Sequence, residues 1–359
     1  MISDSSTIGI NKIGIIGAGR MGTDIFNFLI GYDYEIVWIC IDETETVALQ
    51  QSFEKKIKRL HKCGLIDDQQ VITKQNSVVI NHKVENLNGC DLVIECIWED
   101  IAKKRQMYWD IIPILKGKCI LASNSSSFLP SQLIPDPAFN DRFIGLHFFY
   151  PVKLKNIVEF IKTGQTSAET IEKIKGFCEK TDKKQLLQDE KNAFWLNRLF
   201  LEVQNEAFLI ADEGVMSYEQ IDAMVAEYLF PEGIFKFFDL VGNDVMLQSI
   251  KNYTAGNRDA YHAMLDELEE LCSKNMLGIK TKTGFYNYHD GSVGNAMNIV
   301  PEKDEYYFKI LGRLKKAYVE KAQQLVNDGA CDSETLEYAA KEYMNTDKGP
   351  FAIAKETIK

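Results

Sequence analysis

Long apolar runs are absent from this sequence of 359 residues. None approaches the roughly 20 consecutive apolar residues that a membrane-spanning helix requires. The first residues, Met1 to Asn11, hold an acid and no apolar core segment, so we expect no signal peptide there. Low-complexity stretches are also missing, and we expect no flexible linker between domains. These absences predict a chain that associates with no membrane.

An excess of positive charge is also lacking, because 52 acidic residues outnumber 41 Lys and Arg and give a net charge of -11. The sequence therefore has no overall basic character of the kind that nucleic-acid binding uses. Anionic substrates stay open, since local basic clusters matter more than net charge. A hydrophobic share of 45% and a charged share of 26% are typical of a globular protein, and the length suits two or three domains.

Paired cysteine motifs are missing as well. The chain has eight cysteines, none of them in a CxxC arrangement, and several lie inside apolar runs. We therefore expect reduced core thiols in a cytoplasmic protein, with no disulfide framework and no metal site.

The first half of the chain alternates short apolar segments with stretches of helical spacing. Near-continuous apolar strands of this kind indicate a mostly parallel sheet covered by helices on both faces. The strand candidates are residues 12–17, 36–41, 92–97, 119–122, 143–148 and 157–161.

Strand signals nearly vanish after about Gln188. Residues 192–213 have helical spacing, and Gly214 is placed to end that helix. We expect an α/β domain over residues 1–188, an all-α domain over 189–291, and a second helical repeat or extension over 292–359.

An internal repeat is indicated within the helical part. At an offset of 115 residues Arg198-Leu199 recurs as Arg313-Leu314, and Gly214 recurs as Gly329. At an offset of 116, Gly233-Ile-Phe resembles Gly349-Pro-Phe. Matches at a nearly constant offset favour a duplicated helical unit, while chance similarity of two amphipathic helices is the alternative.

A glycine-rich motif follows the first predicted strand. It reads Gly17-Ala18-Gly19-Arg20-Met21-Gly22, and Asp42 follows 20 residues after Gly22 at the end of the second strand. This is the Rossmann dinucleotide-binding pattern, in which glycines allow a tight turn and let the backbone approach the pyrophosphate at a helix N-terminus. The Asp42 carboxylate would accept hydrogen bonds from ribose hydroxyls and repel an extra phosphate. The motif predicts NAD as cofactor, in preference to NADP.

Three further segments carry a resemblance to a known family. They are Ser123-Asn-Ser-Ser-Ser127, Gly145-Leu-His-Phe-Phe-Tyr-Pro-Val152 and Phe194-Trp-Leu-Asn-Arg-Leu199, and weaker matches lie at 91–95 and 280–288. In this order and spacing they resemble the 3-hydroxyacyl-CoA dehydrogenases over residues 12 to 290. The resemblance implies reversible oxidation of a (3S)-3-hydroxyacyl-CoA to the 3-ketoacyl-CoA with NAD.

A candidate base can be chosen from the residues alone. Removing a hydroxyl proton as hydride leaves suits histidine, and the chain has only five. His147 is the one that ends a predicted buried strand. Glu159 follows 12 residues later, after a turn with Pro151, a spacing that permits a return strand beside the first. A carboxylate there would fix the imidazole tautomer and favour the imidazolium. The resemblance implies that this pair is the catalytic dyad.

Other site residues rest on the resemblance. It implies that Ser126 and Asn197 contact the reacting oxygen, where they would stabilise developing alkoxide charge. It also places Asn124 near the nicotinamide ribose, and Glu95 and Lys104 along the cofactor cleft. For each, a purely structural role is the alternative.

A basic cluster follows the second strand and comprises Lys55, Lys56, Lys58, Arg59 and Lys62. In the family this region lies near the CoA nucleotide, so we expect CoA contact, with a solvated helix face as the alternative.

The sequence also departs from the family pattern. Tyr150 stands where the family has asparagine, Asn192-Ala193 where it has Pro-Gly, and Lys282 where it has glycine; residues 227–230 lack the expected glycines. The departures leave two alternatives open: a CoA-free hydroxy-acid dehydrogenase like the gulonate dehydrogenases related to lambda-crystallin, or a non-catalytic NAD-binding protein. The retained Ser126, His147, Glu159 and Asn197 argue against the second.

Assembly is the last expectation. Shorter members of the family are typically homodimers through their helical domains. Residues 300–359 carry apolar positions at helical spacing, and a tethered copy has a high effective concentration. We expect these residues to dock where a dimer partner would sit and make the chain a monomer, with an ordinary homodimer as the alternative. The apolar positions are Leu311, Leu314, Tyr318, Ala322 and Leu325.

Overall fold

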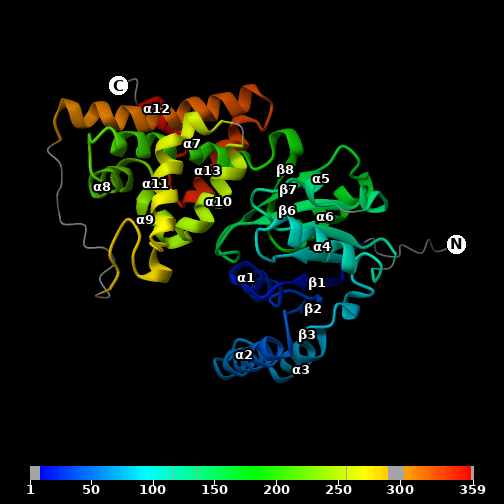
Figure 1. Ribbon diagram of the computed structural model, residues 1–359. Helices are drawn as coiled ribbons and strands as arrows, with labels where there is room; N and C mark the ends of the chain where they lie inside the picture. The colour runs from blue at the N-terminus through cyan, green and yellow to red at the C-terminus, as the bar shows by residue number, and fades with distance from the viewer. Residues whose placement is uncertain (1–8, 116, 135, 256, 290–302, 357–359) are drawn as a thin grey trace. The chain divides into compact units, whose positions relative to one another are not determined.

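The computed structural model of the chain describes residues 9–115, 117–134, 136–255, 257–289 and 303–356. The fold divides into two compact units, Met1–Ala193 and Phe194–Lys359. Figure 1 shows both units with the labels used below.

The N-terminal unit is built on one eight-stranded sheet with the strand order β3-β2-β1-β4-β5-β6-β7-β8. Neighbouring strands are parallel except β6 and β7, which are antiparallel. The strands are β1 Lys12–Ile16, β2 Glu35–Ile39, β3 Val78–Asn81, β4 Leu92–Glu95, β5 Ile120–Ser123, β6 Phe143–Phe148, β7 Ile157–Lys162 and β8 Lys184–Asp189.

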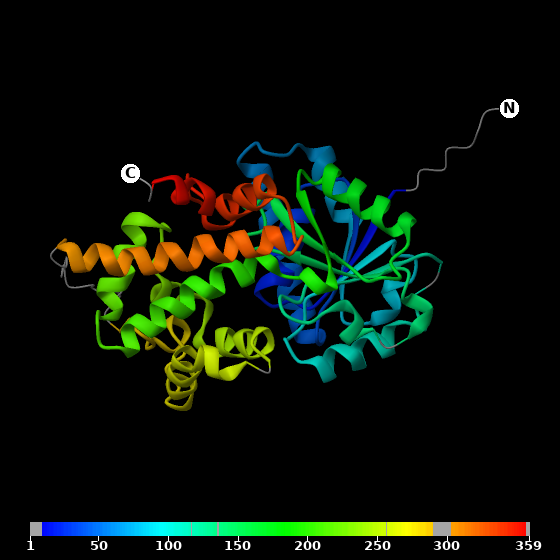
Figure 2. The same cartoon turned by 90° about the horizontal axis from the view of Figure 1, so that it is seen from above.

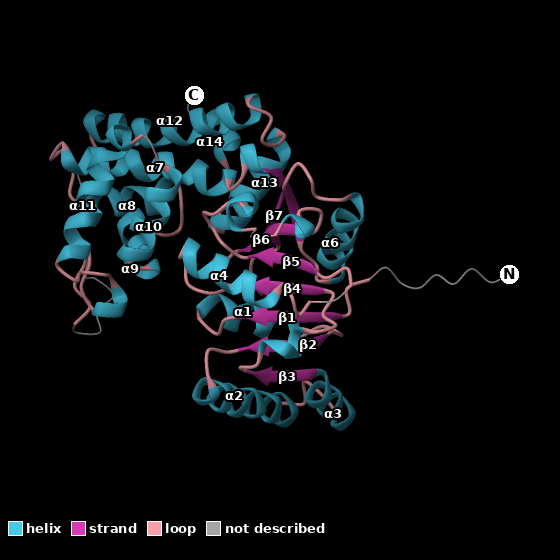
Figure 3. Cartoon of the chain, turned by 45° about the vertical axis from the view of Figure 1, so that its right-hand side comes forward, coloured by secondary structure: helices cyan, strands magenta, loops and turns pink. Residues whose placement is uncertain are grey.

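Helices pack against this sheet and separate two apolar cores. One core joins strand residues to α1, α2 and α6, and the other joins them to α4 and α5. Two cores around one sheet confirm the expected doubly covered Rossmann architecture, and Figure 3 shows the strands side by side. The helices are α1 Arg20–Leu29, α2 Glu43–Lys62, α3 Asp68–Ser77, α4 Ile101–Ile111, α5 Pro130–Leu133 and α6 Ala168–Lys180.

All six strands predicted from apolar runs are present, but β3 and β8 were missed. Both lie at the ends of the sheet order. An edge strand buries only part of its surface, and β8 alternates buried and exposed residues along Lys184–Asp189. β8 therefore forms no continuous apolar run, and the run of β3 is limited to Val78, Val79 and Ile80, of which only Ile80 is buried.

The C-terminal unit is helical, and no strand occurs among its described residues. Its longest helices, α7 and α12, run along each other in both views of Figures 1 and 2, with the Phe200 and Tyr318 ring centroids 5.7 Å apart. The five apolar positions predicted on α12 are all buried. The helices are α7 Trp195–Asp212, α8 Tyr218–Tyr228, α9 Ile234–Val241, α10 Asn243–Tyr253, α11 His262–Ser273, α12 Glu305–Asn327, α13 Ser333–Met344 and α14 Pro350–Glu356.

The ends of these helices correspond at the offset found in the sequence. Gly214 follows α7 with φ +68°, and Gly329 follows α12 with φ +73°, so the first confirms the predicted helix end. Ser217 caps the N-terminus of α8, and Asp332 caps that of α13.

An acid accepts backbone N–H groups of the next turn in each half; Asp222 is buried and Glu337 is half-buried. The Asp222 carboxylate accepts the backbone N–H groups of Phe235 and Lys236 at 2.9 Å each. The Glu337 carboxylate, 115 residues later, accepts those of Gly349 and Phe351 at 2.9 Å each. These correspondences support our proposal that α7–α9 and α12–α14 are two copies of one unit.

Candidate active site

The glycine-rich loop joins β1 to α1 in the way that the motif predicts. Gly17 has φ +103°, and a Cβ there would lie 2.8 Å from the carbonyl oxygen of Cys96. A Cβ on Gly22 would lie 2.1 Å from the carbonyl oxygen of Gly17, so only glycine lets α1 approach the strand. A Cβ on Gly19 would meet no protein atom within 4 Å. The space beside Gly19 therefore fits a ligand, as a pyrophosphate cradle requires.

The first turn of α1 supplies the anion-binding end of the loop. Gly19 is its N-cap and has no side chain to accept the first backbone N–H groups, which suits a bound phosphate. Arg20 and Met21 open the helix, and the Arg20 guanidinium lies 5.7 Å from the centroid of the Tyr150 ring.

Asp42 lies beyond the carboxyl end of β2, the strand beside β1. It is the N-cap of α2, and its carboxylate accepts the backbone N–H of Glu45 at 2.8 Å. The residue is exposed, so the carboxylate can also face a ribose.

His147 and Glu159 face each other across the antiparallel pair of β6 and β7. Nδ1 of His147 lies 2.7 Å from Oε2 of Glu159, and the residues are 8% and 0% exposed. The return strand expected from the 12-residue spacing is thus confirmed. With the Nδ1 proton donated to the carboxylate, proton exchange with a substrate falls to Nε2.

A buried amide completes the surroundings of Glu159. Nε2 of Gln188, on β8, donates to Oε1 of Glu159 at 2.9 Å. The sequence prediction missed Gln188 because it missed β8, and no spacing within the chain signals this contact.

The segment after β5 carries Asn124 and Ser126. The side-chain carbonyl oxygen of Asn124 accepts the backbone N–H of Phe148, next to His147, at 2.8 Å. The Asn124 amide nitrogen is then the atom left to donate toward a ligand. Ser126 is half-buried two residues further on.

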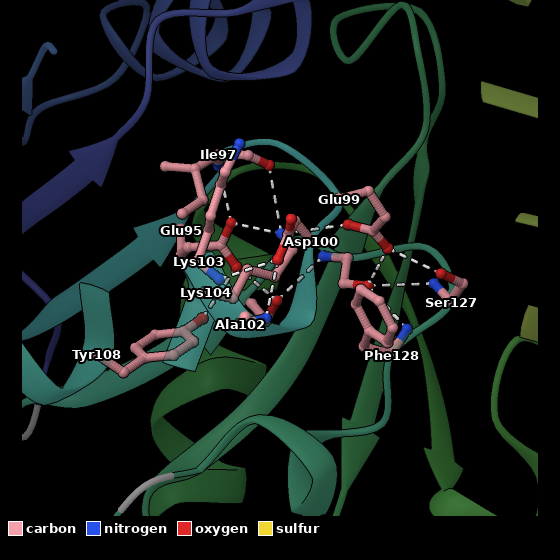
Figure 4. A network of polar contacts seen from close by, with 12 residues as sticks. Glu95, Ile97, Glu99, Asp100, Ala102, Lys103, Lys104, Tyr108, Ser127 and Phe128 are labelled. Carbon is pink, nitrogen blue, oxygen red and sulfur yellow. Dashed lines mark hydrogen bonds and ion pairs between the residues drawn. The ribbon is translucent and has the colours of Figure 1, made fainter. Parts of the chain in front are cut away.

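Glu95 and Lys104 are the centre of a polar network that Figure 4 shows from close by. Nζ of Lys104 lies 2.6 Å from Oε1 of Glu95, and the residues are 1% and 0% exposed. The same carboxylate accepts the Tyr108 hydroxyl at 3.0 Å, the Ser123 hydroxyl at 2.8 Å and the Ile97 N–H at 2.7 Å. The structure thus places both residues, expected along the cofactor cleft, inside the domain as a mutual ion pair.

Glu99 extends this network to the serine-rich segment, and the sequence prediction missed it. Its carboxylate lies 3.2 Å from Nζ of Lys104 and accepts the hydroxyls of Ser125 and, at 2.8 Å, Ser127. Burial lowers the pKa of Lys104, but the Glu95 and Glu99 carboxylates outweigh it, so the pKa is raised and the ammonium stays charged. An acid just beyond a parallel strand, five residues before a lysine, was the available signal.

The basic cluster lies along α2. Lys55, Lys58, Arg59 and Lys62 are exposed, whereas Nζ of Lys56 donates to the side-chain oxygen of Asn27 at 2.6 Å. Partial burial, and then the nearby Lys153, lower the pKa of Lys56. Lys56 thus has a structural partner, and Lys58 lies 3.8 Å from the Glu54 carboxylate. Lys55, Arg59 and Lys62 are exposed and have no such partner in the described part of the chain.

Asn197 belongs to the C-terminal unit, on the first turn of α7. Its side-chain nitrogen donates to the Tyr253 hydroxyl at 2.7 Å. This bond orients the amide within its own unit.

Neither a metal cluster nor a membrane span occurs in the part of the chain that the structure describes. No three His, Cys, Asp or Glu side chains are grouped to hold a metal ion, and no described helix is long and apolar enough to cross a membrane.

Two family models match the chain. The NAD binding domain of 3-hydroxyacyl-CoA dehydrogenase matches residues 12–191, and the C-terminal domain of 3-hydroxyacyl-CoA dehydrogenase matches residues 194–288. Together they cover most of both units.

Individual relatives agree with these matches. A 3-hydroxybutyryl-CoA dehydrogenase of Bradyrhizobium diazoefficiens is 30% identical over 280 residues, which cover 78% of this chain and 96% of the relative. The solved (S)-3-hydroxybutyryl-CoA dehydrogenase PaaH1 of Ralstonia eutropha is 27% identical with a TM-score of 0.70, over 78% of this chain and 99% of the other.

A third similarity includes the C-terminal helices. The structure of a 3-hydroxybutyryl-CoA dehydrogenase of Escherichia coli has a TM-score of 0.80 and covers 97% of this chain and 92% of its own. At 17% identity this likeness shows the fold alone. Both family models and the Bradyrhizobium relative establish that the chain belongs to the 3-hydroxyacyl-CoA dehydrogenase family.

Proposed function

We propose that the chain is an NAD-dependent dehydrogenase that interconverts a (3S)-3-hydroxyacyl-CoA and the 3-ketoacyl-CoA. The observation that carries the proposal is the buried His147–Glu159 pair, 2.7 Å apart, in a domain that matches the family's NAD binding domain. Asn124 adjoins the pair through the backbone of Phe148.

His147 is the base in this reaction. Nε2 takes the hydroxyl proton of the substrate, while Nδ1 keeps its hydrogen bond to Glu159, whose negative charge favours the imidazolium that forms. NAD held at Gly17 to Gly22 would supply the acceptor for the hydride, which leaves the carbon that bears this hydroxyl. The products are the ketone, NADH and the proton held on His147.

Polar side chains serve the oxygen and the cofactor. Ser126 and Asn197 donate hydrogen bonds to the reacting oxygen and lower the cost of the developing alkoxide. Asn124 donates a hydrogen bond from its amide nitrogen toward the nicotinamide ribose. Glu95 and Lys104 act indirectly, through the hydrogen-bond network that holds the serine-rich segment in place.

The CoA portion of the substrate has a candidate site on α2. Exposed Lys55, Arg59 and Lys62 give this helix a basic face that attracts phosphates. Lys56 is the weakest member, since its ammonium is held by Asn27.

A second candidate function is the oxidation of a free hydroxy acid. It is favoured by Tyr150, which stands where the family has asparagine, three residues after His147, and is 53% exposed. A phenol at this position adds a hydroxyl that can bind a carboxylate.

We also propose that the protein is cytoplasmic and monomeric. Eight free cysteines suit a cytoplasmic protein. A second helical repeat packed along α7 suits a monomer, with a homodimer as the alternative.

The experiment is NADH oxidation by the full chain with acetoacetyl-CoA and with a panel of free keto acids. The proposal predicts kcat/KM for acetoacetyl-CoA at least about 100-fold above that for acetoacetate, since CoA contacts contribute binding free energy at about tenfold per 1.4 kcal/mol. A higher kcat/KM for a free keto acid would replace the proposal by the second candidate. No turnover of any keto substrate would favour a non-catalytic role.

A further inference from the structure

We propose that Gln188 is a positioning residue for the dyad, the third member of a hydrogen-bonded chain Gln188–Glu159–His147. The inference rests on the proposed role of His147 as the base. Gln188 touches neither substrate nor cofactor in this role and acts through Glu159.

The geometry assigns one donor to each oxygen of the Glu159 carboxylate. Oε2 lies 2.7 Å from Nδ1 of His147, and Oε1 accepts from Nε2 of Gln188 at 2.9 Å. A carboxylate that is hydrogen-bonded at both oxygens cannot rotate about its terminal torsion without breaking one of the hydrogen bonds. Gln188 therefore fixes the plane in which Glu159 meets the imidazole.

Three adjacent strands supply the chain of side chains. β7 lies between β6 and β8, with His147 directly opposite Glu159. Leu186 is the residue opposite Glu159 on β8, and Gln188 lies two positions further along, opposite Ile161. This diagonal offset places the Gln188 amide on the same face of the sheet as the Glu159 side chain, because successive side chains alternate.

Because both side chains are buried, loss of the Gln188–Glu159 hydrogen bond would be costly. Glu159 is 0% exposed and Gln188 is 2% exposed, so water cannot easily replace the amide. A buried carboxylate oxygen without a donor carries a large desolvation cost. A carboxylate that lost this donor would turn or shift to recover one, and would draw away from His147.

A neutral donor suits the reaction better than a cation. The amide satisfies Oε1 without cancelling the negative charge that favours the imidazolium during hydroxyl deprotonation. A lysine or arginine at this point would satisfy the oxygen and weaken that attraction.

Gln185 provides a matched control on the same strand. It lies opposite Val158, so its side chain is on the other face of the sheet from Glu159 and Gln188, and its Oε1 is buried without a hydrogen-bond partner. Strand β8 thus tolerates an unsatisfied amide oxygen, so the contact of Gln188 is not a general requirement of the strand.

The test uses Gln188→Met and Gln188→Glu in the full chain, with Gln185→Met as control. Methionine keeps the length of the side chain but donates nothing, and glutamate keeps its shape but removes the NH₂ donor. We expect kcat for acetoacetyl-CoA reduction to fall about 10–100-fold in both Gln188 variants, the range for a hydrogen bond to a charged group. KM and NADH affinity should stay close to those of Gln185→Met, and Tm should be lower in Gln188→Met because Oε1 of buried Glu159 loses its donor.

Equal kcat in Gln188→Met and Gln185→Met would overturn the inference. So would full activity in Gln188→Glu at a pH where the introduced carboxyl is ionised, because an ionised carboxylate cannot donate to Oε1 of Glu159. A fall in NADH affinity that accounts for the whole loss would show a structural role only.

A spectroscopic readout separates this inference from the proposed function. In protein labelled with ¹⁵N-histidine, the Nδ1 proton of His147 is the signal missing from His147→Gln. Its chemical shift should change in Gln188→Met and stay unchanged in Gln185→Met. If the wild type turned over no keto substrate, the proposed function would fail, yet this shift would still decide whether Gln188 positions the pair.

Discussion

At the scale of single residues, the proposed chemistry depends on the groups that orient His147. One nitrogen is bonded to a carboxylate that is itself held by a buried amide, and the residue beyond His147 is held by Asn124. Such a base is orientated before substrate arrives, which lowers the cost of reaching the transition state.

Lys104 shows a different use of charge. Its ammonium lies between Glu95 and Glu99, and the second carboxylate binds two hydroxyls of the serine-rich segment. The network fixes the segment that carries Asn124 and Ser126. Its influence on the site is therefore through position, which a residue pattern alone does not distinguish from direct cofactor contact.

Asp42 should decide the choice between NAD and NADP. We predict that Asp42→Ser raises the ratio of kcat/KM for NADPH over NADH by about tenfold or more, because the negative charge that would repel the extra phosphate is removed. Serine keeps an oxygen for the N-terminus of α2, so the helix cap survives.

Glu43→Gln is the control for this substitution. Glu43 is the next residue, and its Oε2 lies 2.9 Å from Nδ1 of His82, so the variant removes the same charge from a side chain with a different partner. An unchanged cofactor ratio in Asp42→Ser would show that Asp42 does not face the ribose.

At the scale of elements, prediction from the sequence worked best where burial is complete. The central strands are buried and mostly apolar, so 143–148 and 157–161 were found, and with them the pairing of His147 and Glu159. The sequence analysis missed edge strand β8 and the acid Glu99, because their roles depend on contacts between segments far apart in sequence. No periodicity within one element records such contacts.

Asp222 makes the stability of the C-terminal unit depend on pH. Its carboxylate accepts two N–H groups at the start of α9 and the Tyr286 hydroxyl at 2.8 Å. Burial raises the pKa of Asp222 from 3.8 to about 6. The folded chain therefore binds this proton more tightly than the unfolded chain, and the contribution of Asp222 to stability falls as pH rises from about 4 to 6 and is constant above.

The side chain of Asp222→Asn cannot titrate. We predict that the stability of this variant rises relative to that of the wild type as pH increases from about 4 to 6. The difference in unfolding free energy should shift by at most about 3 kcal/mol in favour of the variant between pH 4 and pH 7. Urea unfolding at several pH values measures the difference, with the exposed Asp212→Asn as control. A difference that is flat with pH would contradict the assigned proton.

At the scale of the whole molecule, the family models stop at residue 288 while the chain continues through α12–α14. α12 packs along α7, and the half-buried Arg313 binds Glu206 at 2.5 Å and Glu213 at 2.6 and 2.8 Å. A tethered repeat in this place competes with a second subunit at high effective concentration.

We predict that the full chain is a monomer in solution. Light scattering should give a mass near 40.9 kDa, and a stable dimer through α7 would refute the prediction. Deleting residues 300–359 removes the buried positions Leu314 and Tyr318 of α12, so the face of α7 that they cover becomes exposed. That variant should dimerise or aggregate.

The central claim is that His147 is the base of an NAD-dependent dehydrogenase, and His147→Gln tests it most directly. Glutamine removes the titratable group but leaves the glycine-rich loop of residues 17–22 untouched. The measurement pairs kcat for acetoacetyl-CoA reduction with NADH affinity by fluorescence titration. We predict a fall in kcat of about 10²–10⁴-fold, the effect of losing a general acid or base, with NADH affinity unchanged. A kcat near that of the wild type would contradict the account.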